Sequence, residues 1–201
     1  FQIENEYGVP ELEALRAETC ANIIHGHWQG AICLTSILIE AFLKLALVYA
    51  NWEEEEDPSQ AFGGIGISVP EAARRFLGLP LKETIDHAQA QSLIDEDTKI
   101  KLHAYRKQFR NAYFHADMKL MHGSKTALFQ YIDFGSVRTE EPTAIPIHAV
   151  PALMGEEMWQ NARSNAIPYF KKVDALIRET LPKVFPHLNA DQSENPGDEG
   201  E

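Results

Sequence analysis

The residues from Trp28 to Tyr49 are apolar almost all the way round a helix, and this run constrains the fold more than any other segment. A helix with an apolar surface on every side must be surrounded by other helices or by lipid. Glu40 and Lys44 interrupt the run near its middle, which disfavours a membrane span because charged groups are costly in lipid. We therefore expect a central helix covered by its neighbours.

The rest of the chain supplies those neighbours. Of 201 residues, 44% are hydrophobic, which suits one globular domain with a substantial core. We predict a single domain over residues 1–188, with a flexible acidic and glycine-rich insertion at 51–80, a hairpin insertion at 122–152 and a disordered acidic tail at 189–201. The expected fold class is all-α, a bundle of about five helices with a small β-hairpin.

Helix signals divide the domain further. Pro10 suits the first turn of a helix that Gly26 ends, and Asp95 suits the cap of another. Short β-prone runs at 126–134 and 143–150 predict the hairpin. The other expected helices cover 71–78, 80–94, 95–117 and 156–185, the last with Pro168 as a kink or a break. Its inward residues are predicted to be Trp159, Ile167, Phe170, Val173, Ile177 and Val184.

Cysteine and histidine usage gives no sign of a disulfide framework, a metal or a cofactor. Cys20 and Cys33 lie in apolar helical surroundings, as small core side chains do, and this composition suits a reducing cytoplasm. His25 and His27 flank Gly26, but a metal site needs three or four ligands. We expect a cytoplasmic protein that binds no membrane.

Charge is unevenly distributed along the chain. The net charge is −12, yet residues 99–125 hold seven lysines and arginines against one acid, Asp117. This window therefore carries +6 and the remainder −18. A basic region in an acidic protein favours an anionic partner, and we expect RNA contacts from Arg106, Lys107 and Lys119.

The basic window contains Arg110, Asn111 and His115 on one helix. Its core stripe is predicted to be Leu102, Tyr105, Phe109, Ala112 and Ala116. At α-helical spacing the three polar residues fall on the outward half, with Phe114 between Arg110 and His115. An exposed phenylalanine beside a charged site is expected where a second subunit covers it.

Arginine and histidine without a carboxylate pair suit the cleavage of RNA. An imidazole can take the proton of a 2′-hydroxyl, and a guanidinium can bind the phosphate and stabilise the charge of the transition state. Asn111 can orient either group. Two copies in one cleft would supply both a base and an acid, which argues for a symmetric dimer.

The run RNAYFH, residues 110–115, resembles the Arg-Asn-x-x-x-His signature of the HEPN family. The preceding helix, SLIDEDTKIKLHAYRKQFRNAYFHAD, resembles that family's run-up to the motif, and TSILIEAFLKLALVY resembles its early apolar helix with a lone glutamate. The resemblance covers roughly residues 11–120 and extends to the last helix.

The resemblance implies an all-α bundle that forms homodimers and acts as a metal-independent endoribonuclease of toxin–antitoxin, phage-defence or CRISPR systems. Arg110 and His115 would be catalytic, Asn111 would support them, and an antitoxin or other regulatory protein would be a partner. Some HEPN toxins carry a modified tyrosine two residues after the histidine, where this chain has Asp117. Independently of the family, we expect Glu40 to orient Arg110, or else to pair only with Lys44.

Other interpretations stay open. The spacing of Arg110 and His115 can arise by chance on a basic surface. A HEPN-like module can keep the motif and bind a protein or RNA without cleaving it. The apolar run at 28–49 also suits a bundle that binds a small molecule.

Overall fold

The structure is a computed structural model, and it describes residues 7–51, 71–115, 117, 120–121, 124–129, 142–146 and 149–185. Over these ranges the chain is mostly helical with a two-stranded antiparallel hairpin, so the predicted all-α class with a small hairpin is confirmed. The acidic stretch at 52–57, the glycines at 63, 64 and 66 and the tail from 189 lie outside the described residues.

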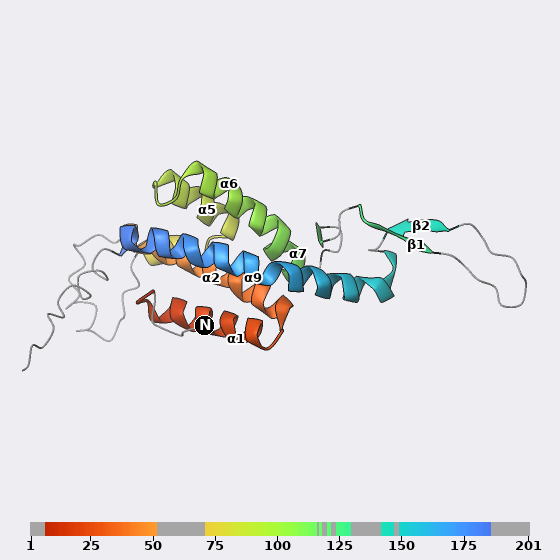
Figure 1. The fold of residues 1–201 in the computed structure, drawn as a ribbon. Helices are drawn as coiled ribbons and strands as arrows, with labels where there is room; N and C mark the ends of the chain where they lie inside the picture. The colour runs from red at the N-terminus through yellow and green to blue at the C-terminus, as the bar shows by residue number, and fades with distance from the viewer. Residues whose placement is uncertain are drawn as a thin grey trace, which may run out of the picture.

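Two long helices form the centre of the bundle. Helix α2 (Trp28–Ala50) packs along α9 (Pro151–Val184), and Figure 1 shows the two side by side between α1 on one side and α5 and α6 on the other. Helix α2 also contacts α1, α4 and α5, which explains why it is apolar almost all round. The predicted central helix is confirmed with nearly the expected bounds.

By length and composition, α2 is also the one described helix that could cross a membrane. In the bundle 61% of its most apolar stretch is buried against protein. A core helix of a globular bundle has the same length and composition, and the packing of α2 is of that kind.

Helix α1 (Pro10–Ile24) begins at its proline, as predicted, because proline suits the first turn where no backbone donor is needed. A tight turn joins it to α2. Gly26 adopts a φ of +73°, a conformation that favours glycine, and so it ends the helix where the sequence placed the break.

Helices α4 (Glu71–Leu77) and α5 (Leu81–Ala90) follow the residues outside the description. The predicted insertion at 51–80 is thus too long, because α4 buries Ala73 and Phe76 in a small cluster with Leu47 and Val48 of α2. Helix α5 is shorter than the predicted 80–94. It ends before Ser92, whose φ of 60° breaks the helical path.

The helix with the RNAYFH motif is continuous, but its hydrogen-bond pattern changes from α-helical to π-helical and back. It runs as α6 (Glu96–Tyr105), a π-helical segment η1 (Arg106–Asn111) and α7 (Ala112–Phe114). Asp95 caps it, since its side chain accepts a hydrogen bond from the Thr98 N–H at 2.7 Å. Of the predicted core stripe, Leu102, Phe109 and Ala112 are buried, Tyr105 is half-buried, and Ala116 is outside the described residues.

Strands β1 (Thr126–Phe129) and β2 (Thr143–Pro146) pair antiparallel, with Thr126 opposite Pro146. This confirms the hairpin within 122–152, although α9 already begins at Pro151. Helix α9 runs unbroken through Pro168, so the proline does not start a second helix. Its first turns extend past the bundle towards the hairpin (Figure 1), which is why Trp159 is 39% exposed and the prediction that it faces inward was wrong.

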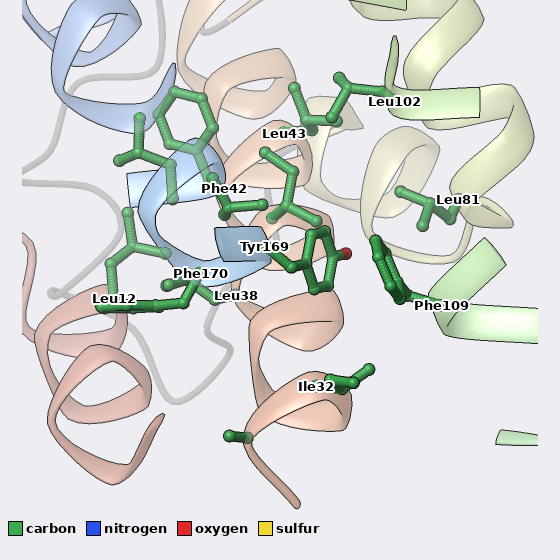
Figure 2. Close-up of a cluster of buried hydrophobic side chains, with 14 of the residues drawn as sticks. Leu12, Ile32, Leu38, Phe42, Leu43, Leu81, Leu102, Phe109, Tyr169 and Phe170 are labelled. Atoms are coloured by element: carbon green, nitrogen blue, oxygen red, sulfur yellow. The ribbon is translucent and has the colours of Figure 1, made fainter. Parts of the chain in front are cut away.

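Apolar side chains from α1, α2, α5, α6, η1 and α9 form one core. Figure 2 shows Phe109 of η1 facing Tyr169 of α9 within it. The two rings stack with their centroids 4.3 Å apart, and Tyr105 meets Tyr169 edge-on at 5.4 Å. The aromatic contacts fix the motif helix against α9.

Ionic contacts tie the N-terminal segment and α1 to α9. Asp174 accepts hydrogen bonds from the Tyr7 hydroxyl, from Nε of Arg16 at 3.1 Å and from Nε of Arg178 at 2.8 Å. We call these residues, Tyr7, Arg16, Asp174 and Arg178, the anchor network. The Arg16 side chain is only 7% exposed, so its charge depends on Asp174 for compensation.

Candidate functional site

Arg110 is held by a carboxylate from the central helix. Its Nε donates to Oε2 of Glu40 at 3.2 Å, and the other oxygen of Glu40 accepts from Nζ of Lys44 at 2.9 Å. The structure thus brings Glu40 and Arg110 together, and it also contains the Glu40–Lys44 pair that was the alternative. We call Glu40, Lys44 and Arg110 the site network.

The way Glu40 holds Arg110 leaves part of the guanidinium unused. Only Nε is engaged, and no described residue accepts a hydrogen bond from the two terminal nitrogens of Arg110. Those nitrogens carry four N–H donors in the planar arrangement that matches a phosphate or a carboxylate. The side chain is 29% exposed, so an anion from solvent can reach it.

His115 lies at the end of the same helix. It is the residue after α7, its side chain is exposed, and its backbone N–H donates to the carbonyl of Asn111 at 3.2 Å. Asn111 is half-buried, and its side chain has no hydrogen-bond partner among the described residues. The structure therefore provides no contact by which Asn111 orients Arg110 or His115 within one subunit.

Phe114 is exposed, as predicted, and it lies beside Arg110. The guanidinium carbon of Arg110 is 5.7 Å from the centroid of the Phe114 ring, and 45% of Phe114 is exposed. Ile37, which precedes Glu40 by three residues on α2, is a second exposed large apolar residue. The surroundings of Arg110 thus combine open donors with exposed apolar side chains.

The motif begins in a π-helical segment. Its hydrogen bonds span five residues, so a turn holds more residues than in an α-helix and each residue rotates less. Arg110, which α-helical spacing placed on the outward half, is half-buried and contacts Glu40 of α2. π-Helical turns occur often at functional sites. An α-helical period read from the sequence does not reveal such a segment.

The structure describes two of the three residues that are predicted to contact RNA. Lys107 is exposed and Arg106 is half-buried, and neither pairs with a carboxylate within the described part of the chain. The Nε of Arg106 is buried without a hydrogen-bond partner there. Lys119 lies outside the described residues.

Other reactive groups near the motif are not prepared for nucleophilic chemistry. Burial raises the pKa of the Cys33 thiol and raises the pKa of Tyr113 to about 12. Both groups therefore stay protonated near neutral pH. Among the described residues no group of three or more histidine, cysteine or acidic side chains could hold a metal ion.

A polar pocket that was not predicted lies between the α5–α6 turn and the C-terminal part of α9. It has a volume of about 380 Å³, and Ser92, Asp95, Glu179 and Lys183 are among its lining residues. These residues come from segments far apart in the chain, so no local pattern signals the pocket. None of the predicted site residues lines it.

Comparison of the chain with protein families, with curated proteins and with solved structures finds no match.

Proposed function

We propose that the protein is a metal-independent endoribonuclease of toxin or phage-defence type, with a composite site of Arg110 and His115 at a homodimer interface. The proposal rests on the contacts of the Arg110 guanidinium. Glu40 fixes its Nε while the terminal nitrogens stay open, and an exposed imidazole lies five residues further along the same helix.

The reaction needs a base, an acid and a cation. The imidazole of one His115 takes the proton of the ribose 2′-hydroxyl, and the 2′-oxygen attacks the adjacent phosphorus. The bond from phosphorus to the 5′-oxygen breaks, and a second imidazole gives that oxygen a proton. The products are a 2′,3′-cyclic phosphate and a 5′-hydroxyl, and the chemistry consumes no metal-bound water.

Arg110 acts on the phosphate. Its terminal N–H groups can bind two phosphate oxygens and stabilise the charge that grows on them in the transition state. Glu40 keeps the guanidinium in one orientation, and Lys44 offsets the negative charge of Glu40. The site network therefore carries a net charge of +1 next to the proposed phosphate position.

A homodimer follows from the need for two imidazoles. One His115 cannot be both base and acid in the same step, and the described residues place no second histidine in contact with Arg110. Phe114 lies beside Arg110, and Ile37 precedes Glu40 by three residues on α2, so both supply exposed apolar surface that a second copy can bury. A regulatory protein such as an antitoxin would restrain this activity in the cytoplasm.

One observation favours a second candidate, a non-catalytic module that binds RNA or protein. Arg110 already has an ion pair with Glu40 and a ring contact with Phe114, which are contacts that a purely structural arginine makes. In this case the motif would stabilise the junction of η1 and α2 and the basic surface would only bind.

Cleavage of labelled RNA in the presence of EDTA distinguishes the candidates. We expect wild type to cleave and to leave 2′,3′-cyclic phosphate ends. His115→Ala should lower the rate by roughly 100-fold to 10,000-fold, and Arg110→Ala by roughly 100-fold to 1,000-fold. His25→Ala is the matched control, since His25 is also an exposed histidine at a helix end.

Cleavage that survives in His115→Ala removes the proposed mechanism. Binding without cleavage in wild type favours the module. Circular dichroism of each variant should match wild type, because His115 is exposed and the side chain of Arg110 is not in the core.

A further inference from the structure

Two stretches of this acidic chain contain cations and no acid. Residues 104–115, in α6, η1 and α7, hold Arg106, Lys107 and Arg110, while residues 158–173 in α9 hold Arg163, Lys171 and Lys172. Each stretch carries +3, so the rest of the chain carries −18 of the net charge of −12. The second stretch lies outside the basic window that the sequence analysis identified.

The fold brings the two stretches together. Phe109 and Tyr105 of the first stretch both contact Tyr169 of the second, and Figure 2 shows the Phe109–Tyr169 pair. At this junction Nζ of Lys172 lies 5.7 Å from the centroid of the Tyr105 ring. A lysine of α9 is therefore next to the residue that immediately precedes Arg106.

The cations at the junction are uncompensated. Arg106, Lys107 and Lys172 have no carboxylate within ion-pair distance among the described residues, whereas Arg16, Lys44 and Arg110 each pair with one. Lys107 and Lys172 are also exposed. Unpaired like charges on packed helices repel one another, and a bound polyanion relieves this repulsion.

We propose that Arg106, Lys107 and Lys172, together with the half-buried Tyr105 whose ring Lys172 contacts, form a binding track for single-stranded RNA that extends from the Arg110 site onto α9. The identity of the ligand rests on the proposed function. A single strand fits this surface because the cations can bind successive phosphates, and the part of the Tyr105 ring that is not buried can contact an unpaired base. Lys172 thus becomes a substrate-binding residue that lies far from the motif in the sequence.

Binding is measured in the His115→Ala background, so that no RNA is cleaved. The probe is a fluorescein-labelled single strand of roughly 12 nucleotides, and the readout is anisotropy across a range of salt concentrations. We expect Lys172→Glu to weaken binding about tenfold and to reduce the slope of log K against log salt by about 0.7. Lys172→Met should give a smaller loss with the same change in slope.

The matched control is Lys82→Glu, which makes the same charge change at an exposed position of α5. It should bind RNA almost as wild type does. Equal losses in Lys172→Glu and Lys82→Glu would mean that only net charge matters and would overturn the track. Equal binding of a duplex of the same length would overturn the preference for single strands, and absence of RNA binding in the background protein would overturn the whole proposal.

This test separates the track from the nuclease. Binding that depends on Lys172, in a protein whose wild type does not cleave RNA, supports the track and rejects the proposed function. Cleavage by wild type with RNA binding that is indifferent to Lys172 supports the function and rejects the track.

Discussion

Asp174 and Glu40 each accept hydrogen bonds from two cationic side chains, but they do so in different surroundings. Asp174 binds Arg16 and Arg178 and also the hydroxyl of Tyr7, and the Arg16 side chain is almost wholly buried. Glu40 binds Lys44 and Arg110, both of which keep part of their surface in solvent. The anchor network thus contains one deeply buried cation, Arg16, although Arg178 is 41% exposed, whereas the site network leaves the terminal nitrogens of Arg110 without a partner among the described residues.

The difference shows how the same ionic arrangement can serve stability or binding. A buried cation that loses its partner is strongly destabilising, because nothing else compensates the charge. A partly exposed cation that loses its partner is compensated by water, and so the cost to stability is small. We expect carboxylate-to-amide substitutions in the two networks to separate these roles.

The largest loss of stability is expected from Asp174→Asn. The substitution keeps the shape of the side chain and removes the carboxylate charge that pairs with the buried Arg16, so the free energy of unfolding should fall by about 3 kcal/mol. Urea unfolding followed by circular dichroism measures this. If Asp174→Asn lowers the free energy of unfolding no more than Glu40→Gln does, the expected difference between the two networks is wrong.

Tyr7→Phe should cost about 1.5 to 3 kcal/mol near neutral pH, since it removes a hydrogen bond to a carboxylate. Burial and the adjacent Asp174 raise the pKa of the Tyr7 hydroxyl above its usual value. Stability from such a group is complete below the unfolded pKa of about 10 and is lost as pH rises above it.

The pH dependence provides the check on Tyr7. The unfolding free energy of wild type should fall as pH is raised from about 9 to about 11, and it should fall less in Tyr7→Phe. Parallel curves for the two proteins would show that the Tyr7 hydroxyl is not the group responsible.

Glu40→Gln should lower the free energy of unfolding by at most about 1 kcal/mol. If the protein is a ribonuclease, kcat should fall about tenfold or more while KM for RNA changes little, because Arg110 loses the group that orients it in the transition state. Rate measurements on wild type, Glu40→Gln and Asp174→Asn test this. An unchanged kcat in Glu40→Gln would limit Glu40 to a structural role.

Phe114→Ser should have the smallest effect on the stability of the subunit, within about 0.5 kcal/mol, because the ring is exposed. If the protein forms the proposed homodimer, the substitution should shift it towards monomer, as measured by sedimentation velocity. Ile100→Ser, at another exposed apolar residue, is the control and should leave the mass unchanged. A monomeric wild type would contradict the composite site.

Much of the fold follows from local sequence signals. Pro10, Asp95 and the apolar run at 28–49 gave helix positions close to those observed, because each acts through its own turn of helix. The contact of Arg110 with Glu40 was also expected, since a charge on a buried helix needs a partner. Whether these residues act as a catalytic site stays a prediction.

Other features depend on contacts that no local pattern contains. Arg16 and Asp174 are 158 positions apart, and the anchor network was not foreseen. The π-helical segment at Arg106–Asn111 was not predicted either, because an α-helical period cannot reveal a change of winding. Trp159 follows the apolar period of α9, but the bundle does not extend far enough to cover it.

The length of α9 has a consequence for motion. Its 34 residues extend over about 51 Å, whereas the 23 residues of α2 extend over about 35 Å, so part of α9 projects beyond its main neighbour. The projecting turns are joined to the segment after the motif by Asn161, which donates to the carbonyl of Met121, and by the Lys125–Glu157 pair. Amide hydrogen exchange should therefore be faster at the start of α9 than where α9 packs along α2, and fraying there would be transmitted to Met121 and Lys125.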